Sequence, residues 1–183
     1  MKTFENIEIN GTNCDLYLSE ESYEHELGKN FRRSGQRINE IYKSNPEIFY
    51  KIYGSVERGI EDFKKQDLKR VANNLMIELL DWSSGVSFET LEKVLEERKS
   101  NRIAILNAHG GTIREEWCYS DNKKYRTINS WIIGQTNKRY GSLLLVCCNK
   151  NNNIPEVIDT PLFFAKGRIG FLSKYEAVLM NTK

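Results

Sequence analysis

The chain has 183 residues, 39% hydrophobic and 28% charged, which is enough apolar material for one core and too little length to require two domains. Its 27 Lys and Arg against 25 Asp and Glu give a formal net charge of +2, far from the basic excess of a phosphate-binding surface, so nucleic acid is not an expected partner. It contains no apolar run of the roughly 18 to 20 residues that a membrane span needs, and Met1–Glu5 lacks the apolar character of a signal peptide, so no membrane partner is expected.

The cysteines fit reduced thiols in a reducing compartment. They form no C-x-x-C pair, and the adjacent Cys147 and Cys148 would close a disulfide only through a strained ring. Neither a zinc site nor a disulfide framework is therefore expected, and the sequence predicts a cytoplasmic protein without a metal or a cofactor.

The start of the chain predicts a pair of short strands. Apolar residues alternate with polar ones on both sides of Asn10 and Gly11, a dipeptide typical of tight hairpin turns. The polar and charged segment that follows, residues 19–34, shows no regular period. It is interpreted as a loop.

Helices are expected over most of residues 34–100. Ser34 is predicted to cap the first of them, Pro46 to lie in the first turn of the second and Ser87 to cap the last. The clearest helix covers residues 68–80, where apolar side chains recur with the three-four spacing of one buried face.

Two short apolar runs in the second half of the chain predict strands that are buried on both faces. They comprise residues 103–106 and 143–146, and Thr127 between them is expected to cap a crossover helix. A strand, a helical crossover and a strand form a right-handed parallel unit, so the two runs are expected to be neighbours in one sheet. Extended segments are expected beyond Asn153.

The sequence therefore predicts one α/β domain over residues 1–183. Residues 1–100 are expected to hold the strand pair and the helices. Residues 101–183 are expected to hold the strands that carry the chemistry and the extended C-terminal segments.

The chemistry is expected where the two apolar runs end, at His109 and Cys148, because functional residues of parallel sheets gather at the carboxyl ends of the strands. Neighbouring strands about 4.8 Å apart would bring the imidazole and the thiol close to hydrogen-bonding range. A thiol beside an imidazolium is a thiolate nucleophile at neutral pH, and the imidazolium can pass its proton to a leaving amine. Gly110 or Gly111, together with the N–H of Cys148, is expected to form an oxyanion hole.

This order of apolar strand, His-Gly, crossover helix, apolar strand and Cys resembles that of caspase-like cysteine peptidases, a group that includes metacaspases, clostripain-like and CHAT-type proteases. The resemblance covers mainly residues 103–149. It implies a caspase-like three-layer sandwich, in which helices flank a mainly parallel central sheet, and a cysteine endopeptidase that cleaves a protein or peptide substrate. It also implies that His109 is the catalytic histidine, Gly110 the oxyanion glycine and Cys148 the nucleophile.

Three further residues need to be weighed beside this dyad. Cys147 and Cys148 point to opposite faces of their strand, so only one of them can meet His109, and the resemblance favours Cys148. His25, in a charged segment, is expected to be exposed to solvent rather than catalytic. Arg33 begins an Arg-Ser-Gly similar to the one with which caspases hold an acidic substrate side chain, although an Arg-Arg pair such as Arg32-Arg33 is more often plain surface charge.

Other classes of function are compatible with parts of the pattern. A catalytically inactive caspase-like module could bind a regulatory protein partner through the same cleft. The segment 107–111 is similar to the Asn-Gly-His-Gly-Gly of creatininase-type metal amidohydrolases, but two histidines are too few for such a metal site. A serine hydrolase is not supported, because no G-x-S-x-G accompanies the His-Gly-Gly.

Overall fold

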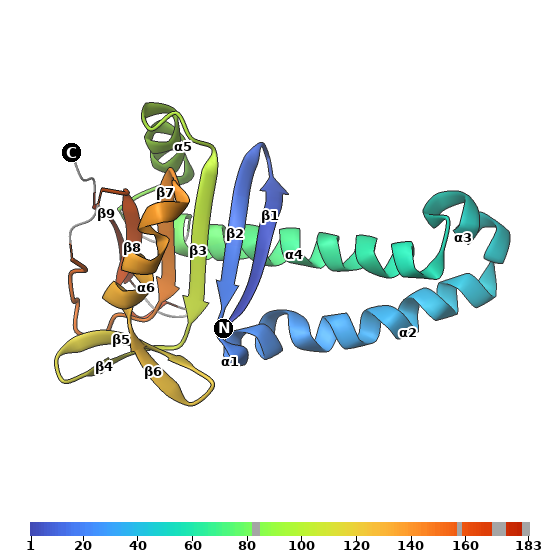
Figure 1. Cartoon of the computed structure of the whole chain (residues 1–183), viewed down its shortest axis with the longest axis horizontal. Helices are drawn as coiled ribbons and strands as arrows, with labels where there is room; N and C mark the ends of the chain where they lie inside the picture. The colour runs from blue at the N-terminus through green and yellow to red at the C-terminus, as the bar shows by residue number, and fades with distance from the viewer. Residues whose placement is uncertain (82–84, 157–158, 170–174, 181–183) are drawn as a thin grey trace.

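The computed structural model describes residues 1–81, 85–156, 159–169 and 175–180. Its centre is a six-stranded sheet (Figure 1). In spatial order the strands are β1 (Lys2–Ile9), β2 (Thr12–Leu18), β3 (Arg102–Ala108), β7 (Ser142–Cys147), β8 (Leu162–Gly167) and β9 (Tyr175–Met180). The inner strands β2, β3, β7 and β8 run parallel, and β1 and β9 lie antiparallel at the two edges. The chain is thus a mixed α/β protein with a mainly parallel central sheet, as predicted.

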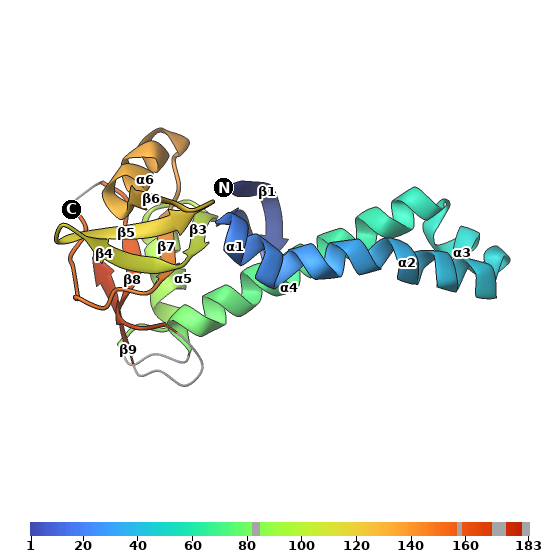
Figure 2. The ribbon, with the colours of Figure 1, turned by 90° about the horizontal axis from the view of Figure 1, so that it is seen from below.

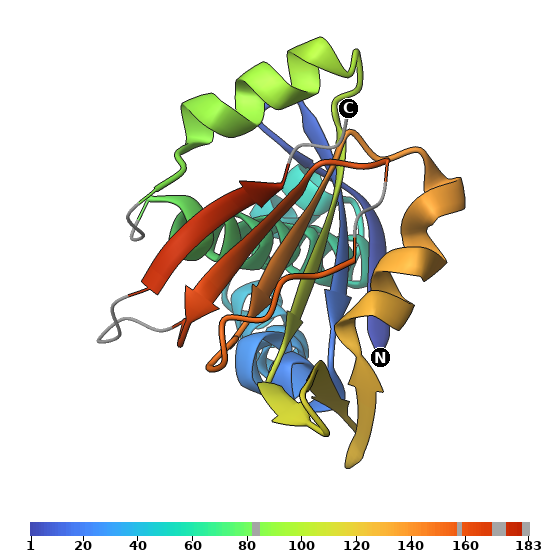
Figure 3. The same cartoon turned by 90° about the vertical axis from the view of Figure 1, so that its left-hand side faces the viewer.

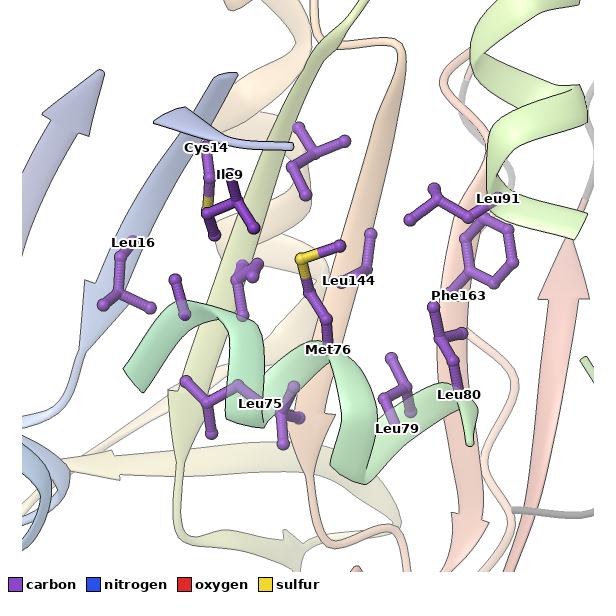
Figure 4. Packing of buried hydrophobic residues seen from close by; sticks show 14 of the residues in the cluster. Ile9, Cys14, Leu16, Leu75, Met76, Leu79, Leu80, Leu91, Leu144 and Phe163 are labelled. Carbon is purple, nitrogen blue, oxygen red and sulfur yellow. The ribbon is translucent and has the colours of Figure 1, made fainter. Parts of the chain in front are cut away.

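Helices lie on both faces of this sheet (Figure 3). On one face, α4 (Val56–Leu80) and α5 (Phe88–Glu97) pack over Ile103, Ile105 and Leu144. On the other, α6 (Ile128–Gln135) packs over Ala104 and Leu106. Successive residues of a strand point to opposite faces, so a continuous apolar run such as that of β3 supplies both cores. Figure 4 shows the first of these cores, with side chains of α4 and α5 packed against the strands.

A second, three-stranded antiparallel sheet follows β3 directly, and the sequence did not predict it. It comprises β4 (Gly110–Ile113), β5 (Glu116–Asp121) and β6 (Lys124–Thr127). Two-residue turns join the strands, and both residues of each turn have positive φ: Arg114 and Glu115 in the first, Asn122 and Lys123 in the second. Such turns ordinarily carry Asn-Gly or Asp-Gly, and without glycine they leave little trace in the sequence.

The predicted loop over residues 19–34 is wrong, because this segment is helical. It contains α1 (Glu20–Tyr23), a π-helical turn η1 (Glu24–Gly28) and the start of α2 (Lys29–Ser44). Ser19, not Ser34, is the N-cap, since its Oγ accepts from the N–H of Ser22 at 3.1 Å. Ser34 lies inside α2 and donates to the carbonyl of Asn30 at 2.8 Å. The π turn adds residues to the helical repeat, which disguises the period that identifies a helix.

Helices α2 and α4, joined by α3 (Pro46–Tyr53), form an arm that extends away from the sheet (Figures 1 and 2). Pro46 lies in the first turn of α3 as predicted, after the N-cap Asn45. The predicted helix 68–80 is the C-terminal part of α4, which packs against the sheet. The predicted caps Ser87 and Thr127 are also present, at α5 and α6.

The extended segments predicted beyond Asn153 are confirmed as strands in β8 and β9. Residues 154–156 form no strand, and the two residues that follow them, 157–158, lie outside the described part of the chain.

Candidate functional site

The two predicted functional residues follow directly after neighbouring parallel strands. In the register of β3 with β7, Ala108 lies opposite Cys147. His109 and Cys148 are the next residues of the two strands. The sheet therefore brings the imidazole-bearing and thiol-bearing positions to one edge, at the carboxyl ends of adjacent strands.

His109 and Cys148 line one cavity of about 290 Å³. Asn107 and Val146 contribute to the sheet side of its wall. The opposite wall comes from segments far away in sequence: α1, the π-helical turn η1, and α4. These segments contribute Ser22, His25, Glu26 and Glu78.

Only one thiol of the adjacent pair faces this cavity. Cys147 is buried in the core beneath α6, and burial raises the pKa of its thiol to about 12. Cys148 is half-buried and lines the cavity. Cys14 and Cys118 are buried as well, and burial raises the pKa of both thiols. Accessibility and location therefore favour Cys148 over the other three cysteines as a nucleophile.

The backbone of Cys148 is held from several sides. The indole N–H of buried Trp117 donates to its carbonyl at 2.9 Å. The next residue, Asn149, exchanges backbone hydrogen bonds of 2.7 and 2.9 Å with Gly167. Gly110 lies against Cys148 so closely that a Cβ there would collide with its carbonyl oxygen and come within 2.8 Å of its backbone nitrogen. These contacts fix the main chain from which the thiol projects.

The side chains of the predicted dyad are not hydrogen-bonded to each other. The thiol of Cys148 donates to the carbonyl of Ile169 at 3.7 Å. Within the described ranges the exposed imidazole of His109 has no hydrogen-bond partner, whereas its backbone carbonyl accepts from the N–H of Ser120 at 2.9 Å. Catalytic hydrogen bonds are often long or absent before substrate binds, so the shared cavity is the more informative relationship.

The two glycines after His109 differ in their backbone roles. Gly110 pairs with Tyr119, and this pair is flanked by the hydrogen bond from the Ser120 N–H to the His109 carbonyl. Because hydrogen-bonded and non-hydrogen-bonded pairs alternate along an antiparallel ladder, the N–H of Gly110 points away from β5. Gly111 occupies the next pair, where the ladder uses the N–H. Gly110 is thus the better candidate for an oxyanion donor.

The structure does not bring Arg33 to this cavity. Arg33 is an exposed residue of α2 and lines a separate groove between α2 and α4, beside Arg37 and Phe63. Its predicted role as a clamp for an acidic side chain next to Cys148 therefore lacks the necessary geometry. His25 has 82% of its side chain exposed, as expected, but it lies at the cavity wall with its Nδ1 2.9 Å from Glu26 Oε1.

Sequence reasoning missed Trp117 and Glu78. Trp117 lies in the small sheet that was not predicted. Glu78 lies one helical turn beyond Leu75, at the border of the apolar face of α4. An acidic residue at the border of a buried helical face was the available signal, but the sequence does not tell which strand end this face covers.

No known protein family, curated protein or solved structure matches the chain. In the described residues, no group of three or more His, Cys, Asp or Glu side chains is arranged to hold a metal ion. Over the same residues, no helix has the length and apolar character required to span a membrane.

Proposed function

We propose that the chain is a cysteine peptidase with a caspase-like three-layer fold, in which Cys148 is the nucleophile and His109 the general acid and base. The observation that carries this proposal is the placement of both residues after the register pair of Ala108 with Cys147, in a common cavity. The parallel inner strands and the helices on both faces of the sheet are compatible with the caspase-like fold.

The chemistry proceeds in two displacements. The thiolate of Cys148 attacks the carbonyl carbon of the scissile peptide, and the carbonyl electrons move to oxygen, where the N–H groups of Gly110 and Cys148 stabilise the charge. Collapse of this intermediate breaks the C–N bond, and the imidazolium of His109 protonates the leaving amine. Neutral His109 then takes a proton from water, whose oxygen displaces the thiolate from the thioester and leaves a carboxylic acid product.

One observation favours a second candidate function, an inactive module that binds a regulatory partner through the same cavity. The Cys148 thiol donates to the Ile169 carbonyl at 3.7 Å, so its hydrogen bond is made with the backbone and not with the imidazole of His109. Catalysis requires the thiol to exchange this partner for His109 when substrate enters. In a module without activity the exchange never occurs.

Labelling of the thiols with iodoacetamide and with an electrophilic peptide ketone distinguishes the two functions. Cys148 should react faster than Cys14 or Cys118 because it is the more accessible thiol. If the dyad operates, His109→Ala should slow the labelling of Cys148 by about 100-fold, the scale of one general acid-base contribution. Peptide mapping by mass spectrometry measures the rate at each thiol.

Accessibility alone predicts fast labelling of Cys148, so the effect of His109→Ala decides the test. An unchanged rate in this variant contradicts the dyad and supports the inactive module. Peptidase activity that survives Cys148→Ala and is lost in Cys147→Ala would show that the neighbouring thiol is the nucleophile.

A further inference from the structure

We infer that the cavity beside Cys148 receives a lysine or arginine side chain of the peptide substrate, and that Glu78 and Glu26 recognise its positive charge. This inference rests on the peptidase function proposed above. It goes beyond that function because it assigns the substrate class and the residues that select it.

The charge of the cavity wall is the first support. Glu26 comes from η1 and Glu78 from α4, so two separate elements each contribute an acidic residue to the wall of the cavity that the proposed nucleophile also lines. None of the described residues that line this space is a lysine or an arginine. Among these same described residues, the basic groups are the imidazoles of His25 and His109.

The lack of a partner for Glu78 is the second support. Glu26 has a partner in His25, at 2.9 Å. Glu78 forms neither a hydrogen bond nor an ion pair with any residue that the structure describes. Burial raises the pKa of the Glu78 carboxyl, and the charge of Glu26 raises it further, although His25 acts in the opposite direction. A half-buried carboxylate without a partner is costly, and a cationic side chain in the cavity would remove this cost.

The size and neighbours of the cavity indicate a single side chain as its occupant. Its volume is about 290 Å³. Pockets that bind drug-sized ligands have volumes of about 300–1,000 Å³, so this cavity is as small as the smallest of them. A peptide whose scissile carbonyl lies at Cys148 places the adjacent side chain next to the same wall. An arginine there can bind a carboxylate through two parallel hydrogen bonds, and a lysine can bind it as a point charge.

An acidic side chain fits this cavity poorly. It would face two carboxylates, and like charges at short range oppose binding. The arginine that would favour it, Arg33, lines a different groove. The preference expected from the structure is therefore the reverse of the acidic preference that Arg33 suggested.

The test uses the full chain and four peptidyl acyloxymethyl ketones that differ only in the residue next to the reactive carbonyl: arginine, lysine, norleucine or aspartate. The rate of covalent labelling of Cys148 is measured by mass spectrometry. The arginine and lysine probes should react at least about tenfold faster than the norleucine probe, the scale of one charge-assisted hydrogen bond, and the aspartate probe should react slowest. Glu78→Gln should reduce the arginine-to-norleucine rate ratio by about tenfold.

The matched control is Glu89→Gln, which removes a carboxylate that is 74% exposed in α5 and paired with Lys93. It should retain the ratio of the unmodified protein. Thermal melting checks that Glu78→Gln folds, and Glu26→Gln provides a second variant with the same expected direction.

Each outcome decides the inference. If the norleucine or aspartate probe labels Cys148 faster than the arginine and lysine probes, the inferred preference for a basic side chain is wrong. The peptidase proposal is unaffected by that result, because Cys148 is still reactive. An unchanged ratio in both Glu78→Gln and Glu26→Gln overturns the role of these carboxylates. If labelling by all four probes is independent of His109, the proposed function itself fails, and the inference fails with it.

Discussion

Gly110 is the point at which the backbones of the two candidate site strands touch. A Cβ at this position would come within 2.8 Å of both the backbone nitrogen and the carbonyl carbon of Cys148. Among the residues that the structure describes, no heavy atom lies within 4 Å of the ideal Cβ position of the neighbouring Gly111. Two adjacent glycines thus offer a matched pair of alanine substitutions, of which only one displaces the proposed nucleophile.

Gly110→Ala is expected to lower the rate at which a peptide ketone labels Cys148 by about 100-fold, the effect of displacing a reacting group by roughly 1 Å. Gly111→Ala should remain within about threefold of the unmodified protein, since a β-strand accepts alanine at little cost. Both rates are measured by mass spectrometry on variants whose folding has been checked by circular dichroism. Equal rates in the two variants would contradict the close approach of Gly110 to Cys148.

At the scale of elements, α3 packs against both α2 and α4 at the end of the arm that is far from the sheet (Figure 1). Phe49 of α3 is 1% exposed, and its ring lies over Gly59 of α4. A Cβ on Gly59 would lie 2.8 Å from Phe49 Cζ and 3.5 Å from two carbons of Ile38. Gly35 of α2, in contrast, has open space around its ideal Cβ position. The two helical glycines therefore differ in what surrounds them rather than in their backbone.

Replacing a helical glycine with alanine stabilises a helix by about 1 kcal/mol, whereas overpacking a filled core costs about 1–3 kcal/mol. Gly35→Ala should thus raise the free energy of unfolding. In Gly59→Ala the clash with Phe49 outweighs the gain, so this free energy should fall by about 1 kcal/mol. Urea denaturation followed by circular dichroism measures both changes. Stabilisation of similar size in the two variants would show that Phe49 does not pack against α4 at Gly59.

The sequence predicts those elements whose signals are local. The strand pair around Asn10, the caps Ser87 and Thr127, and the buried strands β3 and β7 depend on residue types close together in the chain. The π-helical turn η1 and the glycine-free turns of the small sheet give no such signal. Tertiary packing determines these elements, so they become visible only in the assembled fold.

The same division holds for the candidate site. His109 and Cys148 were found because each follows an apolar run, and parallel pairing places the ends of such runs together. Glu78 is 70 residues from Cys148 in the sequence, and it reaches the cavity only because α4 crosses one face of the sheet. Long-range contacts of this kind leave no periodicity to read in a single sequence.

At the scale of the whole molecule, a buried carboxylate ties the two halves of the chain together. Asp15 of β2 is fully buried and accepts hydrogen bonds of 2.6 Å from both Arg102 and Tyr140. Its other oxygen accepts from the N–H of Asn6 at 2.9 Å. Burial by itself raises the pKa of Asp15, but the hydrogen bonds from Tyr140, Asn6 and Arg102 outweigh it, and the net effect lowers the pKa.

A carboxyl whose pKa is lower in the folded state than in the unfolded state contributes stability at pH values above its ordinary pKa, about 3.9 for aspartate. This contribution is lost as the pH falls through the lower, folded-state pKa. Glu78 has the opposite effect on the free energy of unfolding, because its pKa is raised in the folded state. Its ionisation lowers this free energy as the pH rises from about 4.3 through the folded-state pKa. The effect of Asp15 is therefore seen most clearly below pH 4.

Asp15→Asn should lower the free energy of unfolding at pH 7 by about 3 kcal/mol, because it removes the charge that Arg102 and Tyr140 surround. For a chain of this size, the corresponding fall in melting temperature is about 6–12 °C. Melting temperatures measured between pH 7 and pH 2 should decline less steeply at the acid end in Asp15→Asn than in the unmodified protein, since one of the titrating carboxylates is gone. Asp62→Asn, on the exposed surface of α4, serves as the control and should retain the acid decline. Parallel acid declines in Asp15→Asn and the unmodified protein would mean that Asp15 does not act as a stabilising carboxylate in this network.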